Sequence, residues 1–380
     1  MGYNTSMARV VVGMSGGVDS SVAAARVLET GHEALGVTLR HCPAERPGLD
    51  YCGSPDAIAD ARRVCESLGI PHRVVDTSRA FESSVAGPFV ADYLRGRTPN
   101  PCVECNPAVK FAALLSVADE RGGFVATGHY ARVRSAPDGL FRLLKGLDRS
   151  KDQAYFLHRL TQRQLSRTLF PLGDSTKAEV RAEAARRGLS TASKRDSQDV
   201  CFIPDRDYRA FIRARGGRVE PGEIRDLAGR SLGRHRGLAC YTVGQRRGLG
   251  LASREPLYVV RMEPASNTLV VGGEADILSR RFRVARTSWV CGSFPAQTSE
   301  ISRSGPSRTY GSGKFGTEPT ALGVRVRHRA AVLPCRVREF SGGLEVELGR
   351  AAPAVAPGQA AVFYDRDEVL GGGTIQEVLI

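Results

Sequence analysis

The clearest chemical feature of the sequence is a segment rich in glycine and serine near the N-terminus. Residues 15–21, SGGVDSS, follow a short apolar run that predicts a strand and precede an amphipathic run that predicts a helix. Glycines let backbone N–H groups approach phosphate oxygens, and the following helix adds the positive end of its dipole. The segment lacks the Gly-Lys-Ser/Thr of a Walker A site, so it positions no lysine for a γ-phosphate. We predict an anion-binding loop in which Asp19 either holds Mg²⁺ or caps the helix.

Two further segments carry thiols. Residues 96–106, GRTPNPCVECN, contain Cys102 and Cys105 as a Cys-x-x-Cys pair. The prolines are expected to keep this segment extended, and basic residues beside a thiol lower its pKa towards reactivity. The pair alone leaves a redox, a metal-binding and a structural role open. Residues 194–203, KRDSQDVCFI, place Cys201 between basic and apolar neighbours, a pattern that by itself fits a plain buried thiol.

The elements around the loop predict an α/β domain. The first 130 residues alternate β-branched runs with amphipathic segments, which is typical of a parallel sheet with helices on both faces. The expected strands are residues 9–13, 34–39, 72–76 and 124–128. Apolar residues at helical spacing form one stripe that makes Cys65 a core residue. That stripe consists of Ile58, Ala61, Cys65 and Leu68. A capping box of Thr176 and Glu179 predicts a further helix that runs to Gly188.

The sequence changes character after about residue 208, where Gly, Pro and Arg become dense and apolar runs shorten. Short alternating segments separated by turn residues predict a small β-rich central domain and then a compact antiparallel barrel. At 380 residues, two or three domains are expected in any case. We divide the chain into domains 1–208, 209–280 and 281–380, with a flexible insertion at about 299–320 that is rich in Ser, Gly, Thr and Pro.

The charge of the chain favours a polyanionic partner. The net charge is +14, and residues 141–250 alone hold 24 basic and 12 acidic side chains. Such a field favours nucleic acid, although a solvated basic face is the plainer alternative.

The chain has nine cysteines, and this odd number argues against a secreted protein held together by disulfides. No apolar run approaches the roughly 18 residues of a membrane span, and no secretory signal is apparent, so we expect a cytosolic protein with no membrane partner.

Together the three motifs resemble the tRNA-specific 2-thiouridylases of bacteria, the MnmA family within the PP-loop ATP pyrophosphatases. Further matching segments follow in family order and extend the resemblance over residues 10–375. They are ATGHY at 126–130, GLD at 146–148, KDQ at 151–153, GQRRGLG at 244–250, PGQ at 357–359, VFY at 362–364 and LGGG at 370–373.

The resemblance implies an ATP-dependent reaction at a uridine C2 oxygen, with sulfur delivered from a cysteine persulfide. Cys105 corresponds to the family's nucleophile and Cys201 to the residue that receives the persulfide sulfur, with a transient Cys105–Cys201 disulfide. Cys105 would either take up the other half of the persulfide or help to release sulfide. The residues implied in ATP binding are Gly13, Met14, Ser15, Gly16, Gly17, Val18, Asp19, Ser20, Leu39 and Gly128.

The resemblance also implies tRNA as the substrate, with a flipped-out base in a protein pocket. The expected target is wobble uridine 34 of the lysine, glutamate and glutamine tRNAs, and the expected sulfur source is a cysteine desulfurase or a relay protein. Ordinary structural roles for His129 and Lys151 remain the plainer alternatives. The residues implied at the base or at other RNA contacts are Asn100, Pro101, Cys102, His129, Lys151, Asp152, Gln153, Arg327, His328 and Gln359.

One departure from the family pattern concerns Cys102, because many family members carry Asp there. The second thiol leaves open whether Cys102, Cys105 and Cys201 ligate a [4Fe–4S] cluster with one open iron, as in related cluster-dependent tRNA thiolases. Two rival functions are a PP-loop ligase acting on a small molecule and an RNA-binding module with a decayed loop. The thiols and the basic stretch argue against the first, and the intact SGGVDSS segment argues against the second.

Overall fold

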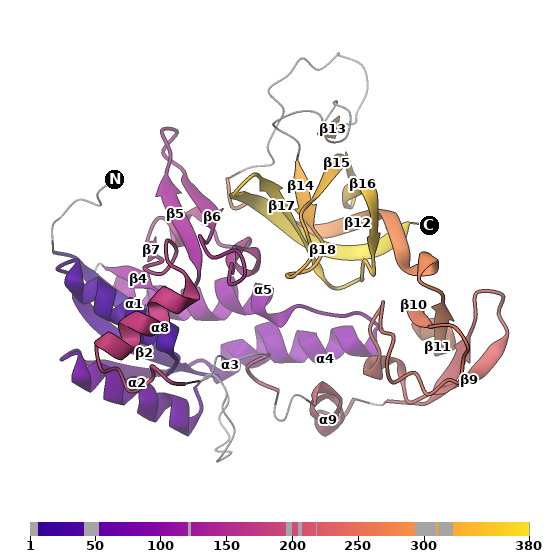
Figure 1. Ribbon diagram of the computed structural model, residues 1–380, viewed down its shortest axis with the longest axis horizontal. Coiled ribbons are helices and arrows are strands. Elements are labelled where there is room, and N and C mark those ends of the chain that lie inside the picture. Colours follow the sequence, from indigo (N-terminus) through magenta and orange to yellow (C-terminus); the bar gives the residue numbers. More distant parts are fainter. Residues whose placement is uncertain are drawn as a thin grey trace.

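The computed structural model describes residues 7–41, 53–120, 123–194, 200–203, 207–217, 219–292, 309–310 and 322–379. It confirms the predicted fold class, a parallel sheet between helices followed by a small β-rich unit and an antiparallel barrel. In Figure 1 the parallel sheet lies at the N-terminal side, the barrel lies above a layer of helices, and the central β unit lies at the opposite end. No helix in these ranges is long and apolar enough to cross a membrane.

The parallel sheet has the strand order β3-β2-β1-β4-β7. Alternate residues of its central strand face opposite layers: Val10 and Val12 pack into one hydrophobic cluster and Val11 into another. The first cluster includes side chains of α1, α2 and α8, and the second includes α6, so helices cover both faces as predicted. The strands are β1 Arg9–Gly13, β2 Glu33–Arg40, β3 His72–Asp76, β4 Phe124–Ala126 and β7 Thr168–Leu169.

Two helices of this domain carry the sequence signals that predicted them. Cys65 is fully buried, which confirms it as a core residue, and Thr176 and Glu179 form both bonds of the expected capping box. The segment predicted to be extended is instead helical from Pro101, because proline fits the first helical position, where no N–H is needed. The α-helices are α1 Val18–Glu29, α2 Pro55–Ser67, α3 Ser78–Phe81, α4 Gly87–Leu94, α5 Pro101–Cys105, α6 Phe111–Asp119, α7 Gln162–Leu165 and α8 Lys177–Arg186. Two π-helical turns, η1 Glu82–Ala86 and η2 Asn106–Lys110, join α3 to α4 and α5 to α6.

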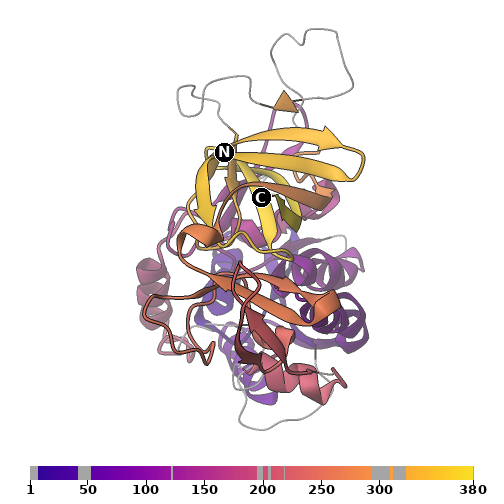
Figure 2. The same cartoon turned by 90° about the vertical axis from the view of Figure 1, so that its right-hand side faces the viewer.

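The central unit is a four-stranded sheet in the order β10-β11-β8-β9, preceded by the helix α9 Tyr208–Ala214. Its buried side chains, among them Ile224, Val259 and Leu269, form a separate small cluster. The view in Figure 2 places this unit below the barrel and against the helical layer. Its strands are β8 Gly222–Arg225, β9 Ser231–His235, β10 Tyr258–Glu263 and β11 Thr268–Gly272.

The barrel closes because β12 pairs with both β16 and β18. A hairpin of β5 Ala131–Ser135 and β6 Phe141–Lys145, which the sequence did not suggest, leaves the N-terminal part of the chain and extends this sheet by pairing with β18. Most of the expected insertion at 299–320 lies outside the described residues; within it, β13 Thr309–Tyr310 pairs with β15. The barrel strands are β12 Leu278–Ser288, β14 Gly323–Arg325, β15 Leu333–Phe340, β16 Gly343–Pro353, β17 Ala360–Asp365 and β18 Glu368–Leu379.

Candidate active site

The glycine- and serine-rich loop joins β1 to α1 and is braced by its own hydroxyls. The Ser20 hydroxyl accepts a hydrogen bond from the Ser15 N–H at 3.2 Å and donates to the Gly17 carbonyl at 3.0 Å. Gly16 has φ +72°, and a Cβ on it would lie 2.4 Å from the carbonyl oxygen of Ala57. The loop is therefore pressed against the start of α2, and its backbone takes a shape that glycine alone accepts there.

The residues implied in ATP binding gather at the carboxyl ends of three neighbouring strands. Gly13 ends β1, Leu39 lies near the end of β2, and Gly128 follows β4. A Cβ on Gly128 would lie 2.7 Å from the carbonyl carbon of Asp19 and 2.8 Å from the Ser20 nitrogen, so its backbone touches the start of α1. A crevice at the carboxyl edge of a parallel sheet is the usual ligand position in such folds.

Asp19 has partners that the sequence did not suggest. Its two carboxylate oxygens accept hydrogen bonds from Lys177 Nζ at 2.7 and 2.8 Å, and the Tyr130 hydroxyl donates to Oδ1 at 2.8 Å. The N-cap of α1 is Gly17, with no side-chain capping bond, so the capping role considered for Asp19 is wrong. Lys177 is buried at the first position of α8, a helix that the capping box did predict. A lysine 158 residues away thus supplies the cation that the loop itself lacks.

The cysteines lie in and beside one hydrophobic cluster. Cys105 ends α5 and is 9% exposed, and it belongs to the cluster that also contains Phe202. Cys201 is half-buried and packs against the same cluster. Phe202 anchors its segment through edge-to-face contacts with Phe81 and Phe89, with ring centroids 5.1 and 5.3 Å apart. Two segments almost a hundred residues apart in sequence are therefore brought together, while residues 195–199 of the second motif lie outside the described residues.

The three cysteines do not form a ready metal site. Among the described residues, which include Cys102, Cys105 and Cys201, no group of three or more His, Cys, Asp or Glu side chains lies close enough to hold a metal ion. The arrangement of the described residues therefore does not fit an iron–sulfur cluster.

Two buried histidines lie near the cation of Lys110. Burial and then Lys110 lower the pKa of His41 to about 4, and the same causes hold the pKa of His129 well below its usual value. His129 is 9% exposed, bonds to Thr127 Oγ1 at 2.7 Å and lies against the ring of Phe111. The ring of His129 is thus enclosed by protein, three residues after the end of β4.

Several residues implied in RNA contact use their polar atoms inside the protein. Asp152, 3% exposed, accepts from the backbone N–H groups of Gly146 and Ala154 at 3.1 Å each. The backbone carbonyl of Asp152 forms a hydrogen bond with His328 Nε2 at 3.0 Å. Gln153 Oε1 accepts a hydrogen bond from the Tyr130 N–H at 3.0 Å.

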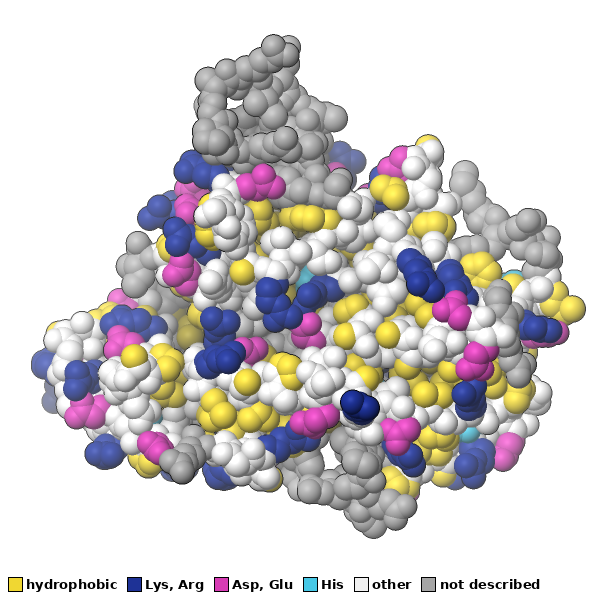
Figure 3. All heavy atoms as spheres, turned by 180° about the vertical axis from the view of Figure 1, so that it is seen from behind, with side chains coloured by type: hydrophobic (Ala, Val, Ile, Leu, Met, Phe, Trp, Pro, Cys, Tyr) yellow, Lys and Arg dark blue, Asp and Glu magenta, His cyan; other side chains and the backbone are white. Residues whose placement is uncertain are grey.

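The other implied RNA contacts divide between interior and surface. Gln359 Nε2 donates to the Thr98 carbonyl at 2.9 Å. Pro101 is buried, Asn100, Cys102 and Lys151 are half-buried, and Arg327 is exposed. Figure 3 shows Lys and Arg side chains spread across one face of the molecule, interspersed with acidic ones. Direct contact with a large polyanion is therefore open to the surface members of the set, but not to the carboxylate of Asp152.

Comparisons with known proteins cover nearly the whole chain. Family models described as a tRNA methyl transferase HUP domain, a tRNA methyl transferase PRC-barrel domain and an aminomethyltransferase beta-barrel domain match residues 8–205, 209–273 and 279–375. The tRNA-specific 2-thiouridylase MnmA of Chloroflexus aurantiacus is 48% identical over 97% of this chain and 98% of its own length. The protein of the same name from Geobacter metallireducens is 44% identical over 98% and 97%.

Solved structures resemble the chain more distantly. A 4-thiouridine synthetase in complex with RNA and bound ATP gives a TM-score of 0.33 and 21% identity, with coverage of 52% of this chain and 46% of that chain. A similarity of this size carries no argument about the site.

Proposed function

Because this chain belongs to the family of the tRNA-specific 2-thiouridylases, we propose that it uses ATP and a cysteine persulfide to convert wobble uridine 34 of tRNA into 2-thiouridine. The enzyme is a tRNA sulfurtransferase with an ATP-binding PP-loop fold. The observation that carries the proposed mechanism is the convergence of two cysteine segments, one on α5 and one containing Cys201 and Phe202, in a single hydrophobic cluster that also includes Ile212 of α9.

The family models use the term methyl transferase, whereas the curated relatives are named 2-thiouridylases. The residues favour sulfur transfer. The glycine and serine loop suits an adenylating enzyme, which needs phosphate binding, and a pair of thiols supplies the soft nucleophile that such an enzyme requires. A methyl transfer has no need to adenylate its substrate, so the loop is the feature that favours sulfur transfer, in agreement with the names of the curated relatives.

The first chemical step is adenylation. The uridine C2 oxygen attacks the α-phosphate of ATP, the bond between the α-phosphorus and the bridging oxygen breaks, and pyrophosphate leaves. The loop from Gly13 to Ser20 would bind the phosphates, and Leu39 and Gly128 would line the nucleotide. Mg²⁺ is held in such sites by one or two carboxylates together with phosphates. Asp19 is the carboxylate that would take this part, and the ion would displace the Lys177 ammonium that now binds both of its oxygens. Joining the oxygen to AMP makes it a good leaving group.

The second step transfers sulfur. The outer sulfur of a Cys201 persulfide attacks C2, and the C2–O bond breaks with loss of AMP. The Cys105 thiolate then attacks the Sγ of Cys201, so that the sulfur–sulfur bond breaks and 2-thiouridine is released. The two cysteines end as a Cys105–Cys201 disulfide, which an external thiol must reduce before the next cycle. The transferred sulfur is thereby reduced by two electrons, and the two cysteines together lose two.

For the RNA, Asn100 and Cys102 would lie against the target base, since they flank the start of the helix that carries Cys105, and the buried Pro101 would fix that start from inside the protein. Lys151 and Arg327 would contact the phosphate backbone. The remaining residues would support this surface from inside the protein, since their polar atoms described above already have partners there. They are His129, Asp152, Gln153, His328 and Gln359. We propose the lysine, glutamate and glutamine tRNAs as substrates, a cysteine desulfurase or relay protein as sulfur donor, and the cytosol as the location.

The central test measures what ATP turnover depends on. We expect pyrophosphate release to require added tRNA and to be matched by 2-thiouridine in the nucleosides of that tRNA, measured by mass spectrometry after reaction with ATP and a persulfide source. A tRNA transcript with cytidine at position 34 is the matched control and should leave both signals at background. Turnover that proceeds without RNA on a small acceptor would contradict the proposal, as would a dependence on a methyl donor.

A separate experiment tests whether Cys102 helps to ligate an iron–sulfur cluster. With protein purified anaerobically and freed of iron, we expect stoichiometric thiolation of tRNA, because the three cysteines are not grouped as metal ligands. A Cys102→Asp variant, which restores the residue common in the family, should retain most of this activity. Activity that appears only after iron and sulfide are restored, together with cluster absorbance that disappears in Cys102→Ser, would instead establish the iron–sulfur mechanism.

A further inference from the structure

The barrel holds the chain just before the cysteine helix by its backbone. The N–H of Thr98 donates to the Pro357 carbonyl at 2.9 Å, and Gln359 Nε2 donates to the Thr98 carbonyl at 2.9 Å. Between them, Gly358 has φ +94°, and a Cβ on it would lie 2.9 Å from three backbone atoms of Thr98. The two backbones therefore touch with no room for a side chain, three residues before α5 begins.

A second barrel contact reaches the helix itself. Glu104 lies between the two cysteines of α5, and its carboxylate is paired with Arg159 of the N-terminal domain and, at 3.2 Å, with Arg286 of β12. The Glu104 side chain is 27% exposed and that of Arg159 is 21% exposed, whereas Arg286 is 60% exposed and approaches the carboxylate from the solvent side. Arg286 has φ +53°, an uncommon backbone state for a residue other than glycine. The strand thus leaves regular geometry at the residue that reaches the cysteine helix.

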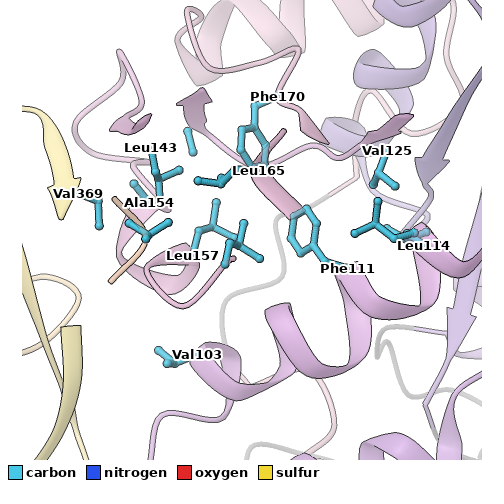
Figure 4. Packing of buried hydrophobic residues seen from close by; sticks show 14 of the residues in the cluster. Val103, Phe111, Leu114, Val125, Leu143, Ala154, Leu157, Leu165, Phe170 and Val369 are labelled. Carbon is cyan, nitrogen blue, oxygen red and sulfur yellow. The ribbon is translucent and has the colours of Figure 1, made fainter. Parts of the chain in front are cut away.

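Apolar packing joins the same two parts. Val103 of α5 is 5% exposed and belongs to a cluster that also contains Val362 and Val369 of the barrel. Figure 4 shows Val103 on its short helix below Leu157 and Ala154, with Val369 on the barrel strand beside them. The cluster continues through Phe111 of α6 to Val125 of the parallel sheet. The middle of α5 therefore enters the same hydrophobic core as the barrel and the sheet.

We propose that the barrel positions the cysteine helix and that Glu104 is a positioning residue for Cys105. A helix of five residues has few hydrogen bonds of its own, so its place depends on tertiary contacts. Transfer between sulfur and carbon needs the reacting atoms within about 3.5 Å and aligned, and a displacement of about 1 Å can cost on the order of 100-fold in rate. This inference rests on the proposed function, because it assigns Glu104 to the same reaction.

The test compares Glu104→Gln and Arg286→Gln with Arg283→Gln. Arg283 lies on the same strand but pairs with Glu377 and Glu345, which belong to other strands of the barrel, and this makes it a matched control. We expect Glu104→Gln to lower kcat by roughly tenfold to 100-fold, with KM for tRNA and for ATP unchanged. Arg286→Gln should cause a smaller fall, because Arg159 still holds Glu104, and the double variant should be no slower than Glu104→Gln. Arg283→Gln should keep the normal kcat.

A second readout needs neither RNA nor ATP. The rate at which iodoacetamide alkylates Cys105, measured by mass spectrometry, should rise severalfold in Glu104→Gln and stay unchanged in Arg283→Gln. An unchanged kcat and alkylation rate in Glu104→Gln would overturn the inference, and so would a raised KM for tRNA at normal kcat, which would place Glu104 and Arg286 in the RNA surface. If tRNA were not the substrate, thiolation would be absent from the unaltered protein as well, while the alkylation difference would persist.

Discussion

A Cys201→Ser variant is expected to release one burst of pyrophosphate in the presence of tRNA and to form no measurable 2-thiouridine. Serine cannot carry a sulfane sulfur as a persulfide, while the adenylation loop is left intact. The rate of thiolation should fall by at least about a thousandfold, the scale of loss seen when an enzyme's nucleophile is removed. The measurement is single-turnover quench followed by nucleoside mass spectrometry, with pyrophosphate assayed in the same samples.

The matched control is Cys291→Ser. Cys291 is also half-buried but packs against the barrel cluster, so its loss should leave both signals normal. A Cys105→Ser variant should show a smaller defect than Cys201→Ser, because Cys102 lies on the same short helix and can partly replace it. Thiolation at a normal rate in Cys201→Ser would refute the assignment of Cys201 as the sulfur carrier.

Gly16→Ala should abolish ATP-dependent turnover. A Cβ at this position would overlap the Ala57 backbone, at 2.4 Å from its oxygen and 2.9 Å from its Cα, and backbone cannot move aside as a flexible side chain can. The positive φ of +72° adds about 1–2 kcal/mol of strain for a residue with a Cβ. The loop must therefore leave α2, which disorders the N–H groups that would face the phosphates. Titration calorimetry with a non-hydrolysable ATP analogue should show binding reduced beyond detection.

The Gly31→Ala variant is the matched control, because it introduces the backbone strain of a positive φ without a steric overlap. Gly31 also has a positive φ, +79°, but a Cβ there would have no atom within 4 Å. Its variant should lose about 1–2 kcal/mol of unfolding free energy and bind the ATP analogue normally. ATP binding by Gly16→Ala within a few-fold of the unaltered protein would show that the loop tolerates a side chain, and would contradict its proposed role.

The nucleotide loop and the fold class could be predicted because they depend on neighbours in sequence. A glycine-rich turn between a strand and a helix, a capping box at Thr176 and a buried stripe through Cys65 are local patterns with local causes. The charge and composition of the chain are likewise known from the sequence without knowledge of the fold. The roles of the cysteines came from family resemblance rather than from spacing, since a Cys-x-x-Cys pair alone fits several chemistries.

Contacts between distant residues could not be predicted, because they are chosen by packing and not by pattern. Pro101 begins a helix because its ring suits that position once Val103 has a core to enter. Asp152 proved to be buried among backbone donors.

Sequence alone therefore determined the fold class, the anion-binding loop and the types of residue available for catalysis. The tertiary structure decided which residues lie beside them. Lys177 reaches Asp19 across 158 residues, and Arg286 reaches Glu104 across 182. The physical reason is that a residue's local pattern fixes its own secondary structure, whereas a buried charge or a short helix is fixed by whatever the completed fold places against it.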